Sequence, residues 1–268
     1  MAKGLSIITC NREDYFKKII ESVPFDKFDK VYVVDASDEE SAYAEKYKSK
    51  GFEVIQKGRK VVGVAKNMGI EAMIEQDIEH MFLMEDDVII KNPDVAEKYI
   101  ETANATGIWG TLAHNTHGDG NFDHDGNAII KNTVKYDNGL GLDFYLNSVQ
   151  PWTYIHRNII RHVGLFDEKY VNAIEHLDHY KLQEIKKLGS FYWWFPSPLN
   201  CQEDMVDVDE KHDGSIIRRD EKWEEHLKEG VKLFHSKYKA SPFNIPEATE
   251  DQMLDRLEFL EQHYAKKL

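Results

Sequence analysis

The sequence is poor in cysteine and lacks any long apolar run. Its two cysteines, Cys10 and Cys201, stand among 268 residues, too few for a disulfide framework or a four-thiolate zinc site. No apolar stretch approaches the roughly 20 residues that span a bilayer. The first residues run into a strand-like segment without the apolar core of a signal peptide. We therefore expect a soluble, cytoplasmic protein of a reducing compartment, with peripheral attachment to a membrane left open.

An excess of basic residues is also missing. The chain has 34 Lys and Arg against 48 Asp and Glu, a formal net charge of −14. This balance argues against a protein that binds the phosphates of nucleic acids non-specifically through its overall positive charge. A local basic patch remains compatible with it. Hydrophobic residues make up 41% of the chain and aromatic residues 12%, which excludes a largely disordered protein. The acidity suits a protein that binds cations, or one that shields an anionic ligand with a metal.

Short apolar strands alternate with helical segments over the first 90 residues. The pattern predicts strands at 5–9, 30–35, 52–55 and 80–84, and helices at 14–23, 39–50 and 63–75. Such alternation indicates an α/β fold with a mainly parallel sheet flanked by helices. Ligands of these sheets bind at the carboxyl ends of the strands. We therefore expect the segments 9–11, 35–37 and 85–87 to lie along one edge.

The alternation of strands and helices is less regular in the second half of the chain. It contains a polar, glycine-rich stretch at 114–127, a segment at 155–163 that suits a strand or a helix, and an amphipathic helix at 176–188. Two further helices are expected at 223–238 and 250–264. No repeat or Pro-rich linker divides the chain. We expect one domain with halves at 1–100 and 101–220, followed by a C-terminal helical extension at 221–268.

Three consecutive carboxylates, Glu85, Asp86 and Asp87, follow the strand predicted at 80–84. Adjacent acidic groups repel one another unless a cation or a basic partner offsets the charge. Oxygen ligands of this kind suit Mg²⁺ or Mn²⁺, especially where ligand phosphates complete the coordination shell. A solvated acidic turn is the alternative interpretation.

Two other segments carry possible ligand-binding groups. Asp35 ends a strand and is suited to accept hydrogen bonds from a ribose or a base, or else to cap a turn. Residues 63–69 have the sequence GVAKNMG, which suits backbone amides and Lys66 near an anion, or an ordinary helix start with an exposed lysine. The P-loop and G-x-G-x-x-G patterns are both missing, so neither an ATPase nor a Rossmann dehydrogenase is supported.

Taken in order, the segments 6–12, 33–37, 63–69 and 82–87 resemble the family 2 glycosyltransferases, whose nucleotide-sugar-binding fold is called GT-A. The resemblance implies that residues 1–100 bind the donor and that residues 101–220 bind the acceptor. Glu85, Asp86 and Asp87 stand for the family's D-x-D metal motif, with Glu in its first position, so Asp87 is the preferred ligand. Lys66 stands where the family usually has Arg. The implied donor-binding residues are Thr9, Asn11, Arg12, Asp35, Lys66, Asn67, Asp86 and Arg218.

The segment 164–168, GLFDE, is similar to the family's G-x-F-D-E segment, which precedes the acidic motif on the acceptor side. That motif corresponds here to residues 175–179, and its base position is occupied by His176. The base is therefore His176, or else Asp178 with Glu175 orienting the acceptor hydroxyl. The pairing of acidic residues with histidines is also similar to a capsule- and chondroitin-type subgroup. A cap network at the start of a helix is the alternative for the two histidines.

Two later histidines compete as a further metal ligand. His212, beside Asp213 and Gly214, resembles a late histidine of the family, whereas His235 has the surroundings of a helix-packing residue. The implied metal set is thus Asp87, Glu85 and His212. Arg218 and its neighbour at 219 are suited to pair with diphosphate oxygens, or to form a solvated basic turn.

Two further features are weighed against simpler interpretations. Trp152, Trp193 and Trp194 have faces suited to stack on a sugar ring, although most tryptophans belong to the core. Residues 121–126 resemble the opening of a calcium loop, but position 132 is Asn rather than Glu and no helix pair flanks the segment. We therefore interpret 121–126 as part of a polar lid or acceptor loop.

The resemblance implies a glycosyltransferase that uses Mn²⁺ or Mg²⁺ and a UDP-sugar, inverts the anomeric centre, and acts on a glycan or glycoconjugate. One alternative is a phage-type enzyme that glycosylates hydroxymethylated pyrimidines in DNA. Its basic groove would use Lys57, Arg59, Lys60, Arg157, Arg161, Arg218 and Arg219. The other is a non-catalytic carbohydrate-binding protein with this fold. A nucleotidyltransferase is disfavoured, because residues 9–12 do not form a Gly-rich basic loop. The oligomeric state is not indicated.

Overall fold

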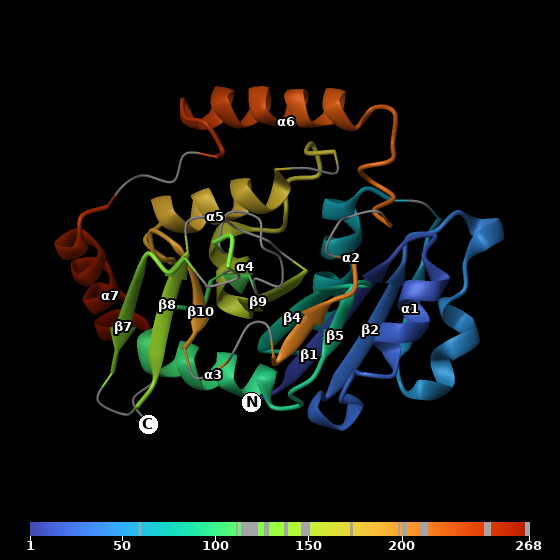
Figure 1. Ribbon diagram of the computed structural model, residues 1–268, viewed down its shortest axis with the longest axis horizontal. Coiled ribbons are helices and arrows are strands. Elements are labelled where there is room, and N and C mark those ends of the chain that lie inside the picture. Colours follow the sequence, from blue (N-terminus) through green and yellow to red (C-terminus); the bar gives the residue numbers. More distant parts are fainter. Residues whose placement is uncertain are drawn as a thin grey trace.

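The computed structural model describes residues 1–58, 60–110, 112–113, 123–125, 129–136, 139–145, 151–171, 174–197, 199, 203–209, 214–243 and 248–265. Its centre is a six-stranded sheet with the order β3-β2-β1-β4-β9-β6 (Figure 1). The strands are β1 (Lys3–Thr9), β2 (Lys30–Asp35), β3 (Glu53–Gln56), β4 (His80–Glu85), β6 (Leu112–Ala113) and β9 (Trp152–His156). The first four run parallel, and β9 is antiparallel to both β4 and β6. The predicted mainly parallel α/β sheet is confirmed.

Helices cover both faces of this sheet because the strands are apolar on both faces. Alternate residues of β4 enter different core clusters: Phe82 and Met84 join one, Met81 and Leu83 the other. The helices are α1 (Glu13–Ile20), α2 (Val62–Glu75), α3 (Val95–Thr106), α4 (Arg157–Val163), α5 (Glu175–Ile185), α6 (Trp223–Tyr238) and α7 (Glu250–Tyr264). The first cluster takes residues from α1, α3 and α7, and the second from α2 and α4.

Two small sheets complete the core. One is antiparallel with the order β10-β8-β7, formed by β7 (Asn132–Lys135), β8 (Gly141–Tyr145) and β10 (Trp193–Pro196). The other pairs β5 (Val88–Ile90) with β11 (Met205–Asp207). The Val208 amide donates a hydrogen bond of 2.8 Å to the Asp87 carbonyl. The β5–β11 pair therefore brings a late acidic segment beside the carboxylates that follow β4.

The helix predicted at 39–50 differs from the observed structure. The segment forms two 3-10 helices, Glu39–Ser41 and Ala44–Lys50, separated by an extended Ala42 with ψ 138°. The break has a polar cause, because the amides of Tyr43 and Ala44 turn inward and donate to the Asp35 carboxylate. The ambiguous segment at 155–163 contains both structures: β9 ends at His156, whose side chain accepts a hydrogen bond from the Asn158 amide and caps α4.

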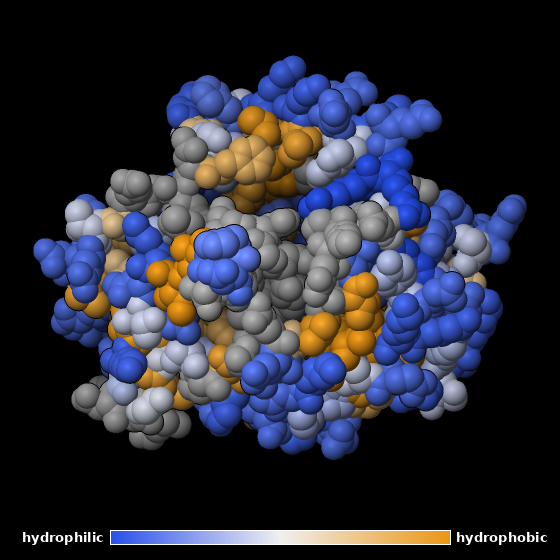
Figure 2. All heavy atoms as spheres, viewed as in Figure 1, coloured by the Kyte–Doolittle hydropathy of each residue, from blue (hydrophilic) through white to orange (hydrophobic). Residues whose placement is uncertain are grey.

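The two C-terminal helices have different environments. Helix α7 begins with a capping box of Thr249 and Gln252, and its apolar side chains join the first core cluster, so it belongs to the main domain. Helix α6 lies apart from the sheet, above α5 (Figure 1), where Phe234 packs against Tyr170 and Ile174. Apolar side chains gather along α6 on the face shown in Figure 2. None of the helices in the described part of the chain combines the length and the apolar character that a membrane span requires.

Close contact between α2 and β1 generates a stability prediction. A Cβ at Gly69 would lie 2.0 Å from Ser6 Oγ and 2.7 Å from Ser6 Cβ, and Ser6 is fully buried. We expect Gly69→Ala to lower the free energy of unfolding by about 1–3 kcal/mol in urea denaturation. Gly63→Ala is the matched control in the same helix, since its Cβ would meet only ordinary contacts at 3.5 Å and beyond. Equal stability of the two variants would contradict this packing.

Candidate functional site

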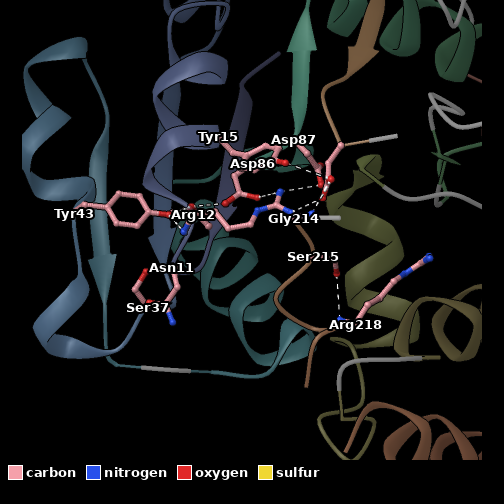
Figure 3. A network of polar contacts seen from close by, with 12 residues as sticks. Asn11, Arg12, Tyr15, Ser37, Tyr43, Asp86, Asp87, Gly214, Ser215 and Arg218 are labelled. Atoms are coloured by element: carbon pink, nitrogen blue, oxygen red, sulfur yellow. Dashed lines mark hydrogen bonds and ion pairs between the residues drawn. The ribbon is translucent and has the colours of Figure 1, made fainter. Parts of the chain in front are cut away.

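Arg12 lies among three carboxylates at the carboxyl edge of the sheet. It follows β1, whereas Asp86 and Asp87 follow β4 and Asp209 follows β11. Its Nη2 donates to Asp86 Oδ1 and, at 2.9 Å, to Asp87 Oδ2, while its Nη1 lies 3.2 Å from Asp209 Oδ2. Figure 3 shows the side chains of Asp86 and Asp87 converging on the Arg12 guanidinium. The cluster of Arg12, Asp86, Asp87 and Asp209 is called the carboxylate cluster below.

The carboxylate cluster contains more acidic than basic groups. Among the described residues, one guanidinium pairs with all three carboxylates, which are 5–8% exposed. Burial raises the pKa of Asp86 to about 6, although Arg12 beside it acts in the opposite direction. Burial alone would lower the pKa of Arg12, but the charges of Asp86 and Asp87 raise it above its usual value. Asp87 Oδ1 is buried and has no hydrogen-bond partner among the described residues. These carboxylate oxygens fit a divalent ion such as Mg²⁺ or Mn²⁺.

Thr9 positions one of these carboxylates. Its hydroxyl donates to Asp86 Oδ2 at 2.6 Å and lies against the Tyr43 hydroxyl, which itself accepts a hydrogen bond from the Arg12 amide. Thr9 is only 1% exposed. The structure thus brings Thr9 into the site as a support for the carboxylate cluster, and its contact with a nucleoside stays a prediction.

Asp35 and Asn11 lie on the same edge but differ in accessibility. Asp35 is 1% exposed, and its carboxylate accepts hydrogen bonds from the amides of Ser37, Tyr43 and Ala44. This favours the turn-capping interpretation. Asn11 is half-buried with φ 51°; its amide donates to Ser37 Oγ, and its side chain donates to Asp38. Of the two, Asn11 is the one accessible to a ligand.

Lys66 connects the end of β4 with the start of α5 instead of being exposed at a helix start. It is 2% exposed, with Nζ 3.1 Å from Glu175 Oε1 and 3.6 Å from Glu85 Oε1. Burial raises the pKa of Glu85 to about 7, against the influence of Lys66. Burial would also raise the pKa of Glu175, but Lys66 and His176 together outweigh it and the pKa is well below its usual value. Lys66 is therefore engaged with protein carboxylates.

Asn67, the next residue of α2, holds the segment at 164–168 in place. Its side-chain amide donates to the Phe166 carbonyl at 2.9 Å and to Glu168, and its side-chain oxygen accepts from the Phe166 amide at 2.9 Å. Asn67 is 2% exposed. Two of the segments that carry the family resemblance, 63–69 and 164–168, are thus in direct contact, and Asn67 positions the chain that leads to α5.

The carboxylate of Asp178 is hydrogen-bonded to side chains of α6. It is 1% exposed, and its Oδ1 accepts hydrogen bonds from Tyr170, Lys237 and Tyr238 at 2.8–2.9 Å. Lys237 also pairs with Asp167. A buried carboxylate with three donors on one oxygen is suited to anchor a helix, and the structure disfavours Asp178 as the base.

The two histidines of α5 have different surroundings. His176 has a side chain that is 24% exposed, with Nδ1 3.6 Å from Glu175 Oε1. His179 is 1% exposed; one ring nitrogen pairs with the Gly164 carbonyl and the other with the Gln183 amide. Burial lowers the pKa of His179 to about 4. His179 is therefore a neutral structural residue, and His176 is the one near solvent.

Several predicted residues lie elsewhere or outside the described residues. His212, Arg59, Cys201 and the polar stretch at 114–122 are outside them. Arg218 is exposed, and Figure 3 shows its side chain directed away from the carboxylate cluster. His235 is exposed on α6, so the helix-packing interpretation is wrong. Trp152, Trp193 and Trp194 are at most 2% exposed, which makes them core residues and leaves no face free to stack on a sugar.

Sequence reasoning missed Asp209. It ends a short extended segment whose register with β5 is a tertiary feature. Its Oδ1 accepts a hydrogen bond of 2.9 Å from the Gly214 amide. A Cβ at Gly214 would lie 2.6 Å from the Tyr15 hydroxyl, so the glycine permits the chain to close around Asp209. The available signal was an Asp in an acidic run with a Gly five residues later.

A second group of potential metal ligands, Glu79, His80 and His156, lies at the opposite edge of the sheet. The Asn158 amide donates to His156 Nδ1 at 3.1 Å, so the proton of the neutral ring is on Nε2, which faces Glu79 Oε1 at 3.4 Å. A ring that accepts at one nitrogen and donates at the other has no lone pair left for a metal. This group is best explained as a structural hydrogen-bond network.

Comparison with known proteins gives fold-level likenesses. No protein-family model matches the chain, and no curated protein matches it in sequence. The chain resembles S. aureus TarS with a TM-score of 0.55 and 17% identity, covering 99% of this chain but only 44% of TarS. It also resembles the mannosyltransferase PcManGT of Pyrobaculum calidifontis, solved with GDP-Man and Mn²⁺ (TM-score 0.53, 14% identity, 96% and 69% covered).

A third likeness is to GalNAc-T7, solved with UDP, GalNAc and Mn²⁺ (TM-score 0.53, 12% identity, 99% and 55% covered). The chain thus spans less than half of TarS and about half of GalNAc-T7. At these identities the likeness is one of fold. The GT-A fold predicted from the sequence motifs is confirmed.

The anchoring role of Asp178 is testable by stability. Asp178→Asn removes the charge that pairs with Lys237 and weakens the acceptor of two tyrosine hydroxyls. We expect the free energy of unfolding to fall by about 2–4 kcal/mol and limited proteolysis to cleave near α6. Glu229→Gln, an exposed substitution on α6, is the control. Wild-type stability of Asp178→Asn would contradict the anchor.

The pKa of His179 predicts a pH dependence of stability. Because the folded-state pKa is about 4 against an ordinary value of 6.5, the unfolded chain takes up a proton that the folded chain rejects. Stability is complete above pH 6.5 and is lost as the pH falls towards 4, by about 1.4 kcal/mol per pH unit from this group. His179→Gln is expected to flatten urea-unfolding profiles over this range, whereas the exposed His124→Gln is not. Parallel profiles for wild type and His179→Gln would refute the assignment.

Proposed function

We propose that the protein is a metal-dependent glycosyltransferase, which transfers a sugar from a nucleotide sugar to an acceptor hydroxyl. The observation that carries the proposal is the carboxylate cluster. Three carboxylates that follow β4 and β11 converge at the carboxyl edge of a GT-A sheet, and a buried oxygen of Asp87 lacks a partner among the described residues. Ligand sites of parallel sheets lie at this edge. The GT-A proteins with bound Mn²⁺ and nucleotide or nucleotide sugar support the same function.

Asp86, Asp87 and Asp209 are the residues that would hold the metal. When bound, a divalent ion would offset the charge that develops on the departing diphosphate. Glu85 points instead to Lys66, since its carboxylate lies 3.6 Å from that ammonium. We therefore replace Glu85 by Asp209 in the ligand set. His212 stays a predicted additional ligand.

The donor that we propose is a UDP-sugar. The support is the resemblance of the sequence motifs, together with GalNAc-T7, which was solved with UDP; the mannosyltransferase was solved with GDP-Man, so the fold accommodates both nucleotides. Asn11 on the accessible part of the edge is the candidate contact to the nucleoside. Arg218, exposed beyond the carboxylate cluster, is the candidate contact to the diphosphate.

For the base we propose His176, with Glu175 beside it. Glu175 is held ionised by Lys66, and a carboxylate with a lowered pKa is a poor proton acceptor but a good partner for an imidazolium. His176 is near enough to Glu175 for such pairing and is partly exposed. The preceding Ile174 is a β-branched residue with φ 72°, a strained conformation of the kind that gathers at functional sites. Direct displacement would then invert the anomeric centre.

A glycan or glycoconjugate hydroxyl is the proposed acceptor, in line with the similarity to the capsule- and chondroitin-type subgroup. The alternative of modified DNA needs a continuous basic groove. Lys57 and Lys60 follow the carboxyl end of β3, whereas Arg157 starts α4 at the opposite edge, where its amide donates to the Glu79 carbonyl and its side chain pairs with Asp77. The basic residues are thus divided between two edges, which disfavours the DNA alternative.

A nucleotide-release assay tests the proposal. Purified protein is incubated with a panel of UDP-, GDP- and other nucleotide sugars, with Mn²⁺ or with EDTA. We expect one donor to release its nucleotide only in the presence of metal. Asp87→Asn should reduce this release by about 100-fold, because the metal loses its principal ligand. Asp77→Asn is the matched control, since its side chain is 96% exposed at the opposite edge.

Two outcomes would contradict the proposed function. Turnover that persists in EDTA and in Asp87→Asn would refute the metal-dependent mechanism. Binding of nucleotide sugars without turnover, with and without glycan acceptors, would favour the non-catalytic carbohydrate-binding protein instead.

A further inference from the structure

Arg12 occupies the space between the proposed metal ligands. We infer that Arg12 is the resident counter-ion of the carboxylate cluster and that a divalent ion binds by displacing its guanidinium. This inference rests on the proposed function. It concerns how the carboxylates are stabilised before the metal binds and how the metal then enters the site. The guanidinium touches one oxygen of each of Asp86, Asp87 and Asp209.

The geometry makes the two cations compete for three oxygens: Asp86 Oδ1, Asp87 Oδ2 and Asp209 Oδ2. A divalent ion needs its oxygens at about 2.1 Å and closely grouped, whereas the guanidinium nitrogens lie 2.9 Å from Asp87 and 3.2 Å from Asp209 and fill the space between them. The Arg12 side chain is only 9% exposed, so its pairs with the carboxylates are largely shielded from solvent. An ion that takes these oxygens must move Arg12 out.

Electrostatics explains why the position is filled by the protein itself. Three buried carboxylates without a cation would repel one another and bear a large desolvation cost. The guanidinium offsets one of the three charges and also lies 4.6 Å from the centre of the Tyr15 ring, in cation–π contact. A divalent ion in place of Arg12 would neutralise more of the carboxylate charge. Because its binding would break the ion pairs of Arg12, Arg12 lowers the affinity of the cluster for the metal.

Lys66 serves as an internal comparison. Its ion-pair partners are Glu85 and Glu175, whereas those of Arg12 are Asp86, Asp87 and Asp209. Of the two buried cations, Arg12 is the one that competes with the metal. Once displaced, an arginine at the edge of the site is well suited to a diphosphate, which it can bind through a planar pair of donors.

The test measures Mn²⁺ binding in the absence of nucleotide. The electron paramagnetic resonance signal of free Mn²⁺ reports how much of the ion stays unbound. We expect Arg12→Gln to bind Mn²⁺ about 10-fold or more tightly than the wild type, because no pairs have to be broken. Arg12→Lys keeps the charge but not the forked geometry, and its affinity should fall between the two. Equal or weaker Mn²⁺ binding by Arg12→Gln would overturn the exchange.

A measurement on the wild-type chain does not depend on how the variants fold. Phenylglyoxal modifies accessible arginines, and peptide mass spectrometry resolves each site. We expect Mn²⁺ to increase the modification of Arg12 several-fold, while Arg161, exposed on α4, stays constant. Unchanged or reduced modification of Arg12 at saturating Mn²⁺ would mean that the guanidinium stays in place, and would overturn the inference.

The same experiments separate this inference from the proposed function. Mn²⁺ binding that requires Asp87 but is insensitive to Arg12 would leave the metal site standing and refute the exchange alone. Failure of the wild type and of Arg12→Gln to bind Mn²⁺ at millimolar concentration would remove the metal itself, and both proposals with it.

Discussion

Mutual repulsion of carboxylates at the carboxyl edge of the sheet is the constraint on which the site depends. Asp86, Asp87 and Asp209 share Arg12, and Glu85 and Glu175 share Lys66. Both cations are buried and come from segments distant in sequence. Each pairs with carboxylates from two separate segments of the chain. The acidity of the chain is thus partly concentrated in one place, where it is balanced by internal cations instead of by solvent.

The fold supplies the two conditions for this balance. Parallel strands bring the ends of β1 and β4 to one edge, which places Arg12 beside the carboxylates after β4. The β5–β11 pair then returns the chain so that Asp209 faces the same guanidinium. Neither condition involves Glu175 or Asp178, the acidic residues of α5. The −14 charge therefore does not oppose the binding of a diphosphate, because the proposed metal would provide the positive field locally.

The polar residues of helix α5 are divided between packed neighbours and the site at the sheet edge. Asp178 and His179 face packed neighbours and are satisfied by α6 and by the chain before the helix. Glu175 and His176 are the first two residues of the same helix. Glu175 faces Lys66, and His176 is partly exposed to solvent. Four polar residues within five positions thus have different roles, because successive residues of a helix point in different directions. Linear spacing alone does not separate a base from an anchor.

Much of the fold was predictable from the sequence, because strand and helix periods record which side chains are buried. The parallel sheet, α2, α6 and α7 follow from such local patterns, and so does the edge that carries Thr9, Asp35 and Asp87. The break at Ala42, the inclusion of α7 in the main core and the presence of Asp209 do not, since each results from contacts between remote segments. The sequence by itself thus determined the sheet and the line of polar residues along its edge. The tertiary structure alone decided which carboxylates face a common cation and which are anchors, because a charge acts on the groups nearest in space and these come from different parts of the chain.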